Sequence, residues 1–543
     1  MEKIPAGWRK SAMNITTPLK RNSFYRIALG SLLGLTVAIC QAKEPLAIAT
    51  ASGSVVGISS GGIESWRGIP YAEPPVGQLR WQPPQPAKPW NTPLKANALA
   101  SSCAQNADLG VFANAGGSED CLYLNVYRSD AAENHRKQPV FVWIHGGALQ
   151  VGAAGDYNPE KLARRGNAVI VTINYRLGLF GFLAHSALDD ENHHVANYGL
   201  MDQQAALHWV QKNIALFGGD ASNVTIAGES SGGNSVMAHM VSPRSAGLFQ
   251  HVIAMSGGGI MTRHPAFGAP LPLSVAREVG NAFAKEAGCE TGGATCLRAL
   301  SSKRILDIQA PFALNEFIID GKLIPEHPSD AYRKGNINRA TLVSGSTRDE
   351  GRFFVALPEL MTGKVMTEAE YPVEIERMYG KALAPKVLRQ YPLPHYDNPS
   401  EAFASAATDS MFACTGRAMN RALADKIPVY AYEFSDRTAP SYIDATSFPL
   451  LAAHTYELAY LFPGFHGGSG TPVKLNPLQE KLSDQMVDHF ADVAALHTQP
   501  SDWPQFDPKQ DNFMTFALPG ARMVSGRFAR AHHCEFWDRT GVY

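Results

Sequence analysis

The short run GESSG, from Gly228 to Gly232, places a serine between two glycines where the local pattern of the chain changes. The β-branched segment VTIAG before it predicts a strand, and NSVMAHM after it is typical of a helix. Two glycines let a strand and a helix approach closely, so the serine between them is exposed in a strained, projecting conformation. The helix N-terminus also favours negative charge that develops beside it. Ser230 is therefore a candidate nucleophile for attack on a carbonyl carbon, rather than part of a chance pentapeptide in a glycine-rich turn.

Such an attack needs hydrogen-bond donors for the carbonyl oxygen as it becomes negative. The segment HGGA, from His145 to Ala148, follows an apolar run, and its glycines leave the N–H groups of Gly146 and Gly147 free to point into a cleft. The N–H of Ser231, beside the candidate nucleophile, is the third expected donor. An ordinary Gly-Gly turn is the alternative, and the serine turn downstream favours the donor interpretation.

A carboxylate and then a histidine should follow the serine in a chain of this kind. The segment VSGSTRDEGRFF places Asp349 and Glu350 after a predicted strand, and the residue types do not choose between them. His454 has apolar flanks, FPLLAAHTYELAYLF, which suit a half-buried base but equally suit a histidine at the edge of a core. Pattern alone does not rank it firmly among the histidines that follow: His395, His454, His466, His489, His497, His532 and His533.

The elements that must position these residues alternate along the chain. Gln138–Leu149 and Ala168–Gly178 are apolar runs without clean alternation, as expected of strands buried on both faces of a mainly parallel sheet. A helix pattern follows and is closed by Gly218 and Gly219, and later strands are expected over 251–258 and 340–351. This order predicts an α/β fold with a large, mostly parallel sheet, helices on both faces and functional groups beyond the strand ends.

The composition fits a large folded enzyme. The chain has 543 residues, 45% of them hydrophobic and 18% charged, and no repeat or linker interrupts it. Residues 1–42 read as a signal peptide, since Lys20, Arg21 and Arg26 precede the apolar run Ile27–Cys40 and small residues follow. We expect one catalytic domain over 43–543 and export to the periplasm or the medium, without a lipid or membrane anchor.

The net charge bears on binding partners, and the cysteine content bears on disulfides and metal sites. Residues 1–42 contain six basic and one acidic residue, so 42 basic and 48 acidic residues remain, a net charge of −6 that favours neither nucleic acid nor an anionic membrane. Six cysteines remain as well, which allow fifteen pairings. The close pairs 103/121 and 289/296 are natural disulfide candidates and leave 414 with 534. No CxxC or paired-histidine spacing suggests a metal site.

Seven ordered motifs resemble those of the type-B carboxylesterases, the carboxylesterase/cholinesterase branch of the α/β-hydrolases. The resemblance runs from about Gly53 to Trp537. Its motifs are RGIPYAEPPVGQLRW, SEDCLYLNVY, VFVWIHGGAL, VIVTINYRLGLFGFL, NYGLMDQQAALHWVQKNIALFGGDASNVTIAGESSGG, TRDEGRFF and HCEFW. The resemblance implies an α/β-hydrolase fold and hydrolysis of a small-molecule carboxylic ester by water, with no cofactor or metal.

The same resemblance assigns roles to single residues. It implies a Ser230, Glu350 and His454 triad, oxyanion amides from Gly146, Gly147 and Ser231, and buried acids at Glu229 and Glu457. It also implies an Arg80–Glu119 ion pair and three disulfides, Cys103–Cys121, Cys289–Cys296 and Cys414–Cys534.

Two departures from the family pattern bear on activity. Ser231 stands where the family usually has alanine, which adds a hydroxyl near the oxyanion hole. The loop from Cys103 to Cys121 contains no tryptophan, whereas cholinesterase-like members use one there to hold a quaternary ammonium. Choline esters are therefore not the expected substrates.

Two alternatives to a general esterase stay open from sequence. The same triad could serve amides, thioesters, lactones or carbamates, because leaving-group preference depends on pocket shape. A catalytically silent binding domain can share the fold, although this chain keeps all three triad residues. Phe312, Phe317 and Phe353 could line a substrate pocket or be ordinary core aromatics.

Overall fold

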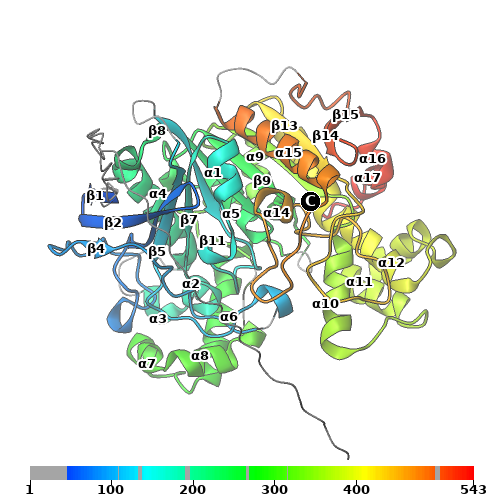
Figure 1. The fold of residues 1–543 in the computed structure, drawn as a ribbon. Coiled ribbons are helices and arrows are strands. Elements are labelled where there is room, and N and C mark those ends of the chain that lie inside the picture. The colour runs from blue at the N-terminus through cyan, green and yellow to red at the C-terminus, as the bar shows by residue number, and fades with distance from the viewer. Residues whose placement is uncertain are drawn as a thin grey trace, which may run out of the picture. The chain divides into compact units, whose positions relative to one another are not determined.

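Seven parallel strands form the centre of the sheet and explain the long apolar runs of the sequence. In the computed structural model the order is β1-β2-β3-β5-β7-β6-β8-β9-β12-β13-β14-β15, and the strands from β7 to β14 in this order are parallel (Figure 1). The structure describes residues 46–107, 109–131, 137–189, 196–264, 268–312, 314, 316–495 and 502–543. The predicted signal peptide, 1–42, lies outside these residues, so both it and the expected domain boundary stay predictions.

The strands of the large sheet have these bounds: β1 Leu46–Thr50, β2 Gly53–Ser60, β3 Ile63–Pro70, β4 Leu94–Lys95, β5 Tyr123–Ser129, β6 Gln138–Ile144, β7 Val169–Ile173, β8 Gly219–Glu229, β9 His251–Met255, β12 Thr341–Thr347, β13 Val429–Phe434, β14 Asn512–Phe516 and β15 Arg522–Ser525. A two-stranded sheet pairs β10 Leu271–Pro272 with β11 Ile318–Ile319. Each predicted strand is present, and β6, β7, β9 and β12 all end before the predicted boundaries because turns or short helices follow them.

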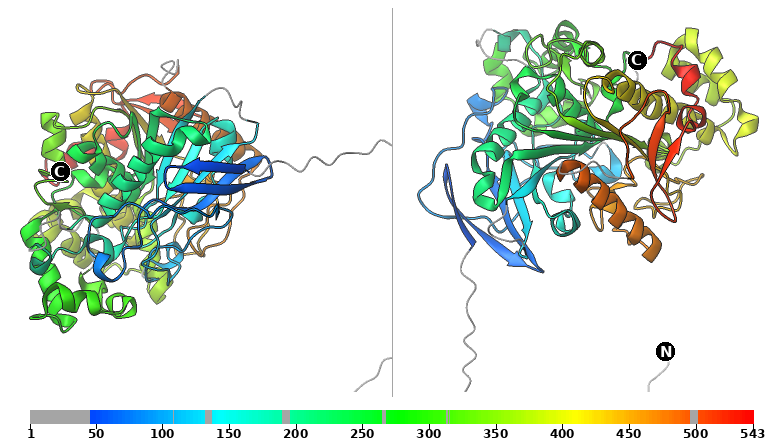
Figure 2. Two further views of the ribbon diagram at one scale, coloured as in Figure 1. Left: turned by 90° about the vertical axis from the view of Figure 1, so that its left-hand side faces the viewer. Right: turned by 90° about the horizontal axis from the view of Figure 1, so that it is seen from above.

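Helices cover both faces of the sheet. On one face lie α4 (Tyr198–Asn213), α5 (Ser231–Val241) and α13 (Cys414–Leu423), and on the other α1 (Glu160–Arg165) and α15 (Pro477–Ala495) (Figure 2). Alternate β6 residues enter separate cores: Val140, Val142 and Ile144 in one, Phe141 and Trp143 in the other. A strand buried on both faces needs no polar alternation, which is why its sequence reads as a continuous apolar run. The α/β fold class is confirmed.

The remaining helices are α2 Gly178–Phe182, α3 Ser186–Asp189, α6 Leu273–Glu286, α7 Gly293–Ala299, α8 Ser302–Ile308, α9 Pro328–Lys334, α10 Gly351–Thr362, α11 Tyr371–Gln390, α12 Pro399–Ala407, a π-helix Thr408–Ala413, α14 Leu458–Leu461, α16 Phe528–Ala531 and α17 Cys534–Trp537. Within the described part of the chain, no helix combines the length and the apolar character needed to cross a membrane.

Covalent and ionic links fasten the segments outside the sheet. The three disulfides Cys103–Cys121, Cys289–Cys296 and Cys414–Cys534 are present, which confirms the pairings. Arg80 and Glu119 form a bidentate ion pair. Arg80 Nε lies 2.6 Å from Glu119 Oε2, and Arg80 Nη2 lies 2.5 Å from Glu119 Oε1. Since both side chains are almost buried, this pair fixes geometry more than it adds stability.

A buried histidine fixes the C-terminal segment against the π-helix. The two ring nitrogens of His532 lie 2.7 Å from Asp409 of the π-helix and 2.7 Å from Glu433 of β13. Burial alone would lower the pKa of His532, but the hydrogen bonds and charges of the two carboxylates outweigh burial and raise it to about 10. The His532 side chain is therefore a buried cation between two anions.

His532→Gln is expected to lower the free energy of unfolding at neutral pH by about 3 kcal/mol, because two buried carboxylates lose their cation. The wild-type contribution is complete below pH 6.5, the ordinary histidine pKa, and falls as the pH rises toward 10, since only the folded protein then keeps the proton. Urea unfolding of both proteins across this range measures it, with the exposed His395→Gln as control. A wild-type-to-variant difference that stays constant with pH would contradict the assignment.

Candidate active site

The turn between β8 and α5 holds Ser230 in a conformation that few residues adopt. Its φ is 58° and its ψ is −124°. A Cβ on Gly232 would lie 2.1 Å from the Ile144 carbonyl oxygen, and one on Gly228 would lie 2.4 Å from the Gly232 carbonyl carbon. Only glycine permits these approaches, so the two glycines are what allows the strained turn. The Ser230 N–H donates to the Met255 carbonyl, which ties the turn to β9.

The segment after β6 faces this turn and carries unpaired amides. Gly147, Ala148 and Leu149 have φ values of 105°, 55° and 59°, so three consecutive residues lie in the left-handed region. Within the described ranges, the N–H groups of Gly147, Ala148 and Ser231 have no acceptor. The Gly146 N–H lies near the Tyr157 hydroxyl and partly offsets the rise that burial causes in the Tyr157 pKa.

Ala148 was missed by sequence reasoning. That reasoning looked for glycines, whereas Ala148 acquires its outward amide from a positive φ that alanine rarely adopts. Its place directly after the glycine pair was the available signal.

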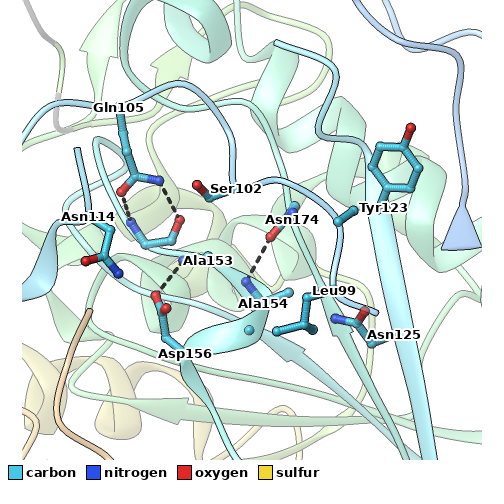
Figure 3. Close-up of a pocket in the computed structure, with 13 residues that line it drawn as sticks. Leu99, Ser102, Gln105, Asn114, Tyr123, Asn125, Ala153, Ala154, Asp156 and Asn174 are labelled. Atoms are coloured by element: carbon cyan, nitrogen blue, oxygen red, sulfur yellow. Dashed lines mark hydrogen bonds between the residues drawn. The ribbon is translucent and has the colours of Figure 1, made fainter. Parts of the chain in front are cut away.

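Three polar side chains that line a cavity of about 200 Å³ bind the backbone of residues 152–154, further along the segment after β6 (Figure 3). Gln105 accepts from the Gly152 N–H and donates to the Gly152 carbonyl, at 2.8 and 3.0 Å. Asp156 accepts from Ala153 N–H at 2.9 Å, and Asn174 accepts from Ala154 N–H at 2.8 Å. Burial raises the pKa of Asp156 to about 6 although the Ala153 amide opposes the rise. These directional bonds fix the path of the chain just beyond the unpaired amides.

Glu350 and His454 are brought together after β12. His454 Nδ1 lies 2.5 Å from Glu350 Oε2, and both side chains are buried. Glu350 Oε1 accepts from the Ser256 hydroxyl at 2.5 Å and from the Thr347 N–H at 2.8 Å. The neighbouring Asp349 instead forms a bidentate pair with Arg437. The structure thus distinguishes the two carboxylates that the sequence pattern left equivalent.

Aromatic rings enclose the imidazole of His454. The rings of Phe354, Phe412 and Phe353 have centroids 4.9, 5.0 and 6.0 Å from it. Phe317 packs against Phe182, away from this cluster. Phe312 packs against Phe283, so of the three phenylalanines singled out from sequence only Phe353 lies beside the histidine.

The serine and the histidine are not hydrogen-bonded to each other. Among the described residues the Ser230 hydroxyl has no hydrogen bond, and His454 Nε2 lies 3.1 Å from Glu229 Oε1. His454 therefore lies between Glu350 and Glu229, and Glu229 is the residue that precedes Ser230 in the sequence. Catalytic hydrogen bonds are often long or absent without substrate, so this spacing is compatible with a nucleophile and base that meet on substrate binding.

Two further buried carboxyl groups adjoin the histidine. Burial, then the charges of Glu457 and Glu350, raises the pKa of Glu229 well above its ordinary range. Burial and then the charge of Glu350 do the same for Glu457. Neither Glu457 oxygen has a hydrogen-bond partner in the described structure. An uncompensated carboxylate is costly in such a place, so the folded protein favours the protonated form of Glu457.

Glu457→Gln is expected to change the free energy of unfolding by less than about 1 kcal/mol below pH 4.5, where the carboxyl is uncharged in both the folded and the unfolded chain and the amide keeps its shape. Above that pH the variant should become increasingly more stable than the wild type. The folded wild type keeps a proton that the unfolded chain loses near pH 4.5, so its stability falls as the pH rises above that value. In the Glu457→Gln variant the free energy of unfolding should therefore fall less steeply with pH than in the wild type, whereas the exposed Glu368→Gln variant should keep the wild-type slope. Chemical unfolding between about pH 5 and 8 measures the slopes, and parallel slopes would refute a neutral Glu457.

Within the part of the chain that is described, no three His, Cys, Asp or Glu side chains are grouped so as to hold a metal ion.

Comparisons with known proteins point to one family. The model of the carboxylesterase family matches residues 44–537. Para-nitrobenzyl esterase of Bacillus subtilis (strain 168) is 34% identical over 84% of this chain and 89% of its own, and human cocaine esterase is 31% identical over 90% and 89%. A solved thermophilic PNB esterase superposes with a TM-score of 0.76 at 30% identity, covering 90% of this chain and 99% of its own. The chain therefore belongs to the carboxylesterase family, has the α/β-hydrolase fold and is a serine hydrolase of carboxylic esters.

Proposed function

We propose that Ser230, His454 and Glu350 are the catalytic triad and that ester hydrolysis proceeds through an acyl-enzyme on Ser230. The buried contact between His454 Nδ1 and Glu350 Oε2, beside the strained Ser230 turn, is the observation that carries this proposal. A histidine whose Nδ1–H is held by a carboxylate presents Nε2 as the base, which is the tautomer that a serine nucleophile requires.

The reaction proceeds in two acyl transfers. His454 Nε2 takes the proton as Ser230 Oγ bonds to the ester carbonyl carbon, and Glu350 stabilises the imidazolium. The tetrahedral intermediate then collapses, the bond to the alcohol oxygen breaks, and His454 gives the alcohol its proton. Water repeats the sequence: it loses a proton to His454, attacks the acyl carbon and releases the acid together with a free Ser230.

The oxyanion donors belong to two loops. Sequence reasoning named Gly146, Gly147 and Ser231, and we retain Gly147 and Ser231 as principal donors because their amides are unpaired within the described residues. Ala148 joins them for the same reason. Gly146 contributes less in this proposal, since its N–H already lies near the Tyr157 hydroxyl. Loss of one such donor typically costs about 3 kcal/mol of transition-state stabilisation.

Glu229 and Glu457 tune the charge around the histidine. Glu229 lies against His454 Nε2, the nitrogen that receives the serine proton. A neutral Glu229 leaves that nitrogen basic and available. An ionised Glu229 would attract the imidazolium proton and compete with proton return to the leaving alcohol. The raised pKa of Glu229 therefore suits the proposed proton transfers.

We further propose that residues 1–42 are an export signal, that 43–543 form the catalytic domain, and that the mature enzyme acts in the periplasm or outside the cell. Three disulfides support this location, because such bonds persist in oxidising compartments. Simple esters are the proposed substrates. Choline esters are not, since the first disulfide loop lacks a tryptophan.

Purified mature protein should hydrolyse p-nitrophenyl esters from acetate to decanoate, and its chain-length optimum will size the acyl site. Ser230→Ala should lose turnover by about 10⁴-fold or more, and Glu350→Gln by roughly 10⁴-fold, because the amide cannot stabilise the imidazolium. Asp349→Asn is the matched control and should retain turnover, since Asp349 contacts Arg437 and not His454. Equal losses in the Asp349 and Glu350 variants, or turnover that survives Ser230→Ala, would exclude this triad.

A further inference from the structure

Ser231 carries a hydroxyl whose role the proposed reaction does not explain. Its N–H is a proposed oxyanion donor, and its side chain is buried with 5% of its surface exposed. We propose that the Ser231 hydroxyl is a positioning group that locks the two loops of the oxyanion hole to each other. This inference rests on the proposed function and assigns the residue that fixes its geometry.

The first contact joins Ser231 to the segment after β6. The Leu149 N–H donates to Ser231 Oγ at 3.1 Å, and Leu149 is only 1% exposed. Leu149 and Ala148 both have positive φ, a strained conformation that persists only where the surroundings enforce it. The Ser231 hydroxyl thus holds the end of the strained turn that directs the Gly147 and Ala148 amides outward.

The second contact leads from Ser231 to the start of the same turn. The Tyr175 hydroxyl donates to the His145 carbonyl oxygen at 2.8 Å. Burial raises the pKa of Tyr175, and the Ser231 hydroxyl opposes that rise, as expected if it donates to the phenolic oxygen. The Tyr175 and His145 rings stack with centroids 4.4 Å apart.

Two hydrogen bonds hold the turn at its two ends. The Leu149 N–H donates to Ser231 Oγ, and the Tyr175 hydroxyl, whose pKa the Ser231 hydroxyl lowers, donates to the His145 carbonyl oxygen. His145 and Leu149 flank the proposed donors on either side, so Ser231 anchors the Leu149 end directly and Tyr175 anchors the His145 end. The Ser231 amide is thereby set at a fixed distance from those of Gly147 and Ala148.

Alanine at position 231 would keep the backbone amide but leave the buried Leu149 N–H without an acceptor. The turn could then relax toward a less strained conformation, which would move the donors away from the oxyanion. Such a change weakens binding of the transition state more than binding of the ester. An ordinary packing role would instead lower stability without a selective effect on the chemical step.

The test compares Ser231→Ala with wild type in steady-state hydrolysis of p-nitrophenyl butyrate. We expect kcat to fall by about tenfold and KM to stay within about twofold. Affinity for an aryl trifluoromethyl ketone, which forms a tetrahedral adduct with the serine, should fall by a similar factor. Ser245→Ala is the matched control: this hydroxyl is fully buried and bonds His239 and Gln204, but it does not touch the turn.

The control should lose stability without losing kcat or inhibitor affinity. Tyr175→Phe gives a second measurement should Ser231→Ala fail to fold; it removes the hydrogen bond to the His145 carbonyl at the other end of the turn and should lower kcat by about threefold. Wild-type kcat and inhibitor affinity in Ser231→Ala, or equal kcat losses in Ser231→Ala and Ser245→Ala, would overturn the inference. Activity that survives Ser230→Ala would instead refute the proposed triad, so the two failures are distinguishable.

Discussion

The site depends on direct backbone contact between two segments at positions where glycine leaves no side chain in the way. Gly232, at the start of α5, lies against the Ile144 carbonyl, and a Cβ on Gly146 would lie 2.6 Å from the Glu229 carbonyl oxygen. Because these chains touch, the candidate nucleophile on one loop and the unpaired amides on the other form a single rigid unit. A methyl group on Gly232 or Gly146 would separate them by a distance that matters for an oxyanion contact.

The second constraint is the mutual repulsion that three buried glutamates near His454 would have if all were ionised. Hydrogen bonds to one of them reduce this repulsion by favouring a single anion. Glu350 receives donors from Ser256 and the Thr347 N–H besides the histidine. Glu457 receives none from the described residues, and burial raises its pKa well above the ordinary range. Like charges so close together could not all persist in a medium of low dielectric constant. The donors around Glu350 thus determine which of the carboxyl groups can serve as the anion beside His454.

The local sequence pattern is enough to predict the strand–serine–helix turn, the Gly-Gly segment and the α/β fold class, because each depends on residues that are close in sequence. It did not separate Asp349 from Glu350, since the difference lies in Arg437, 88 residues further along. Resemblance to a family made that choice. Neither route indicated that Ala148 would expose its amide or that Tyr175 would meet Ser231, because both follow from backbone strain and tertiary packing that no motif encodes.

The anchoring of the segment after β6 shows why polar contacts appear where apolar packing would be less costly to bury. Apolar packing fixes position but tolerates rotation of a peptide plane, whereas a hydrogen bond also fixes direction. An oxyanion donor is useful only when its N–H points at one place. The segment is accordingly held by Gln105, Asp156 and Asn174 behind it and by Ser231 in front. Buried polar side chains here supply orientation, which is the property that the proposed chemistry requires.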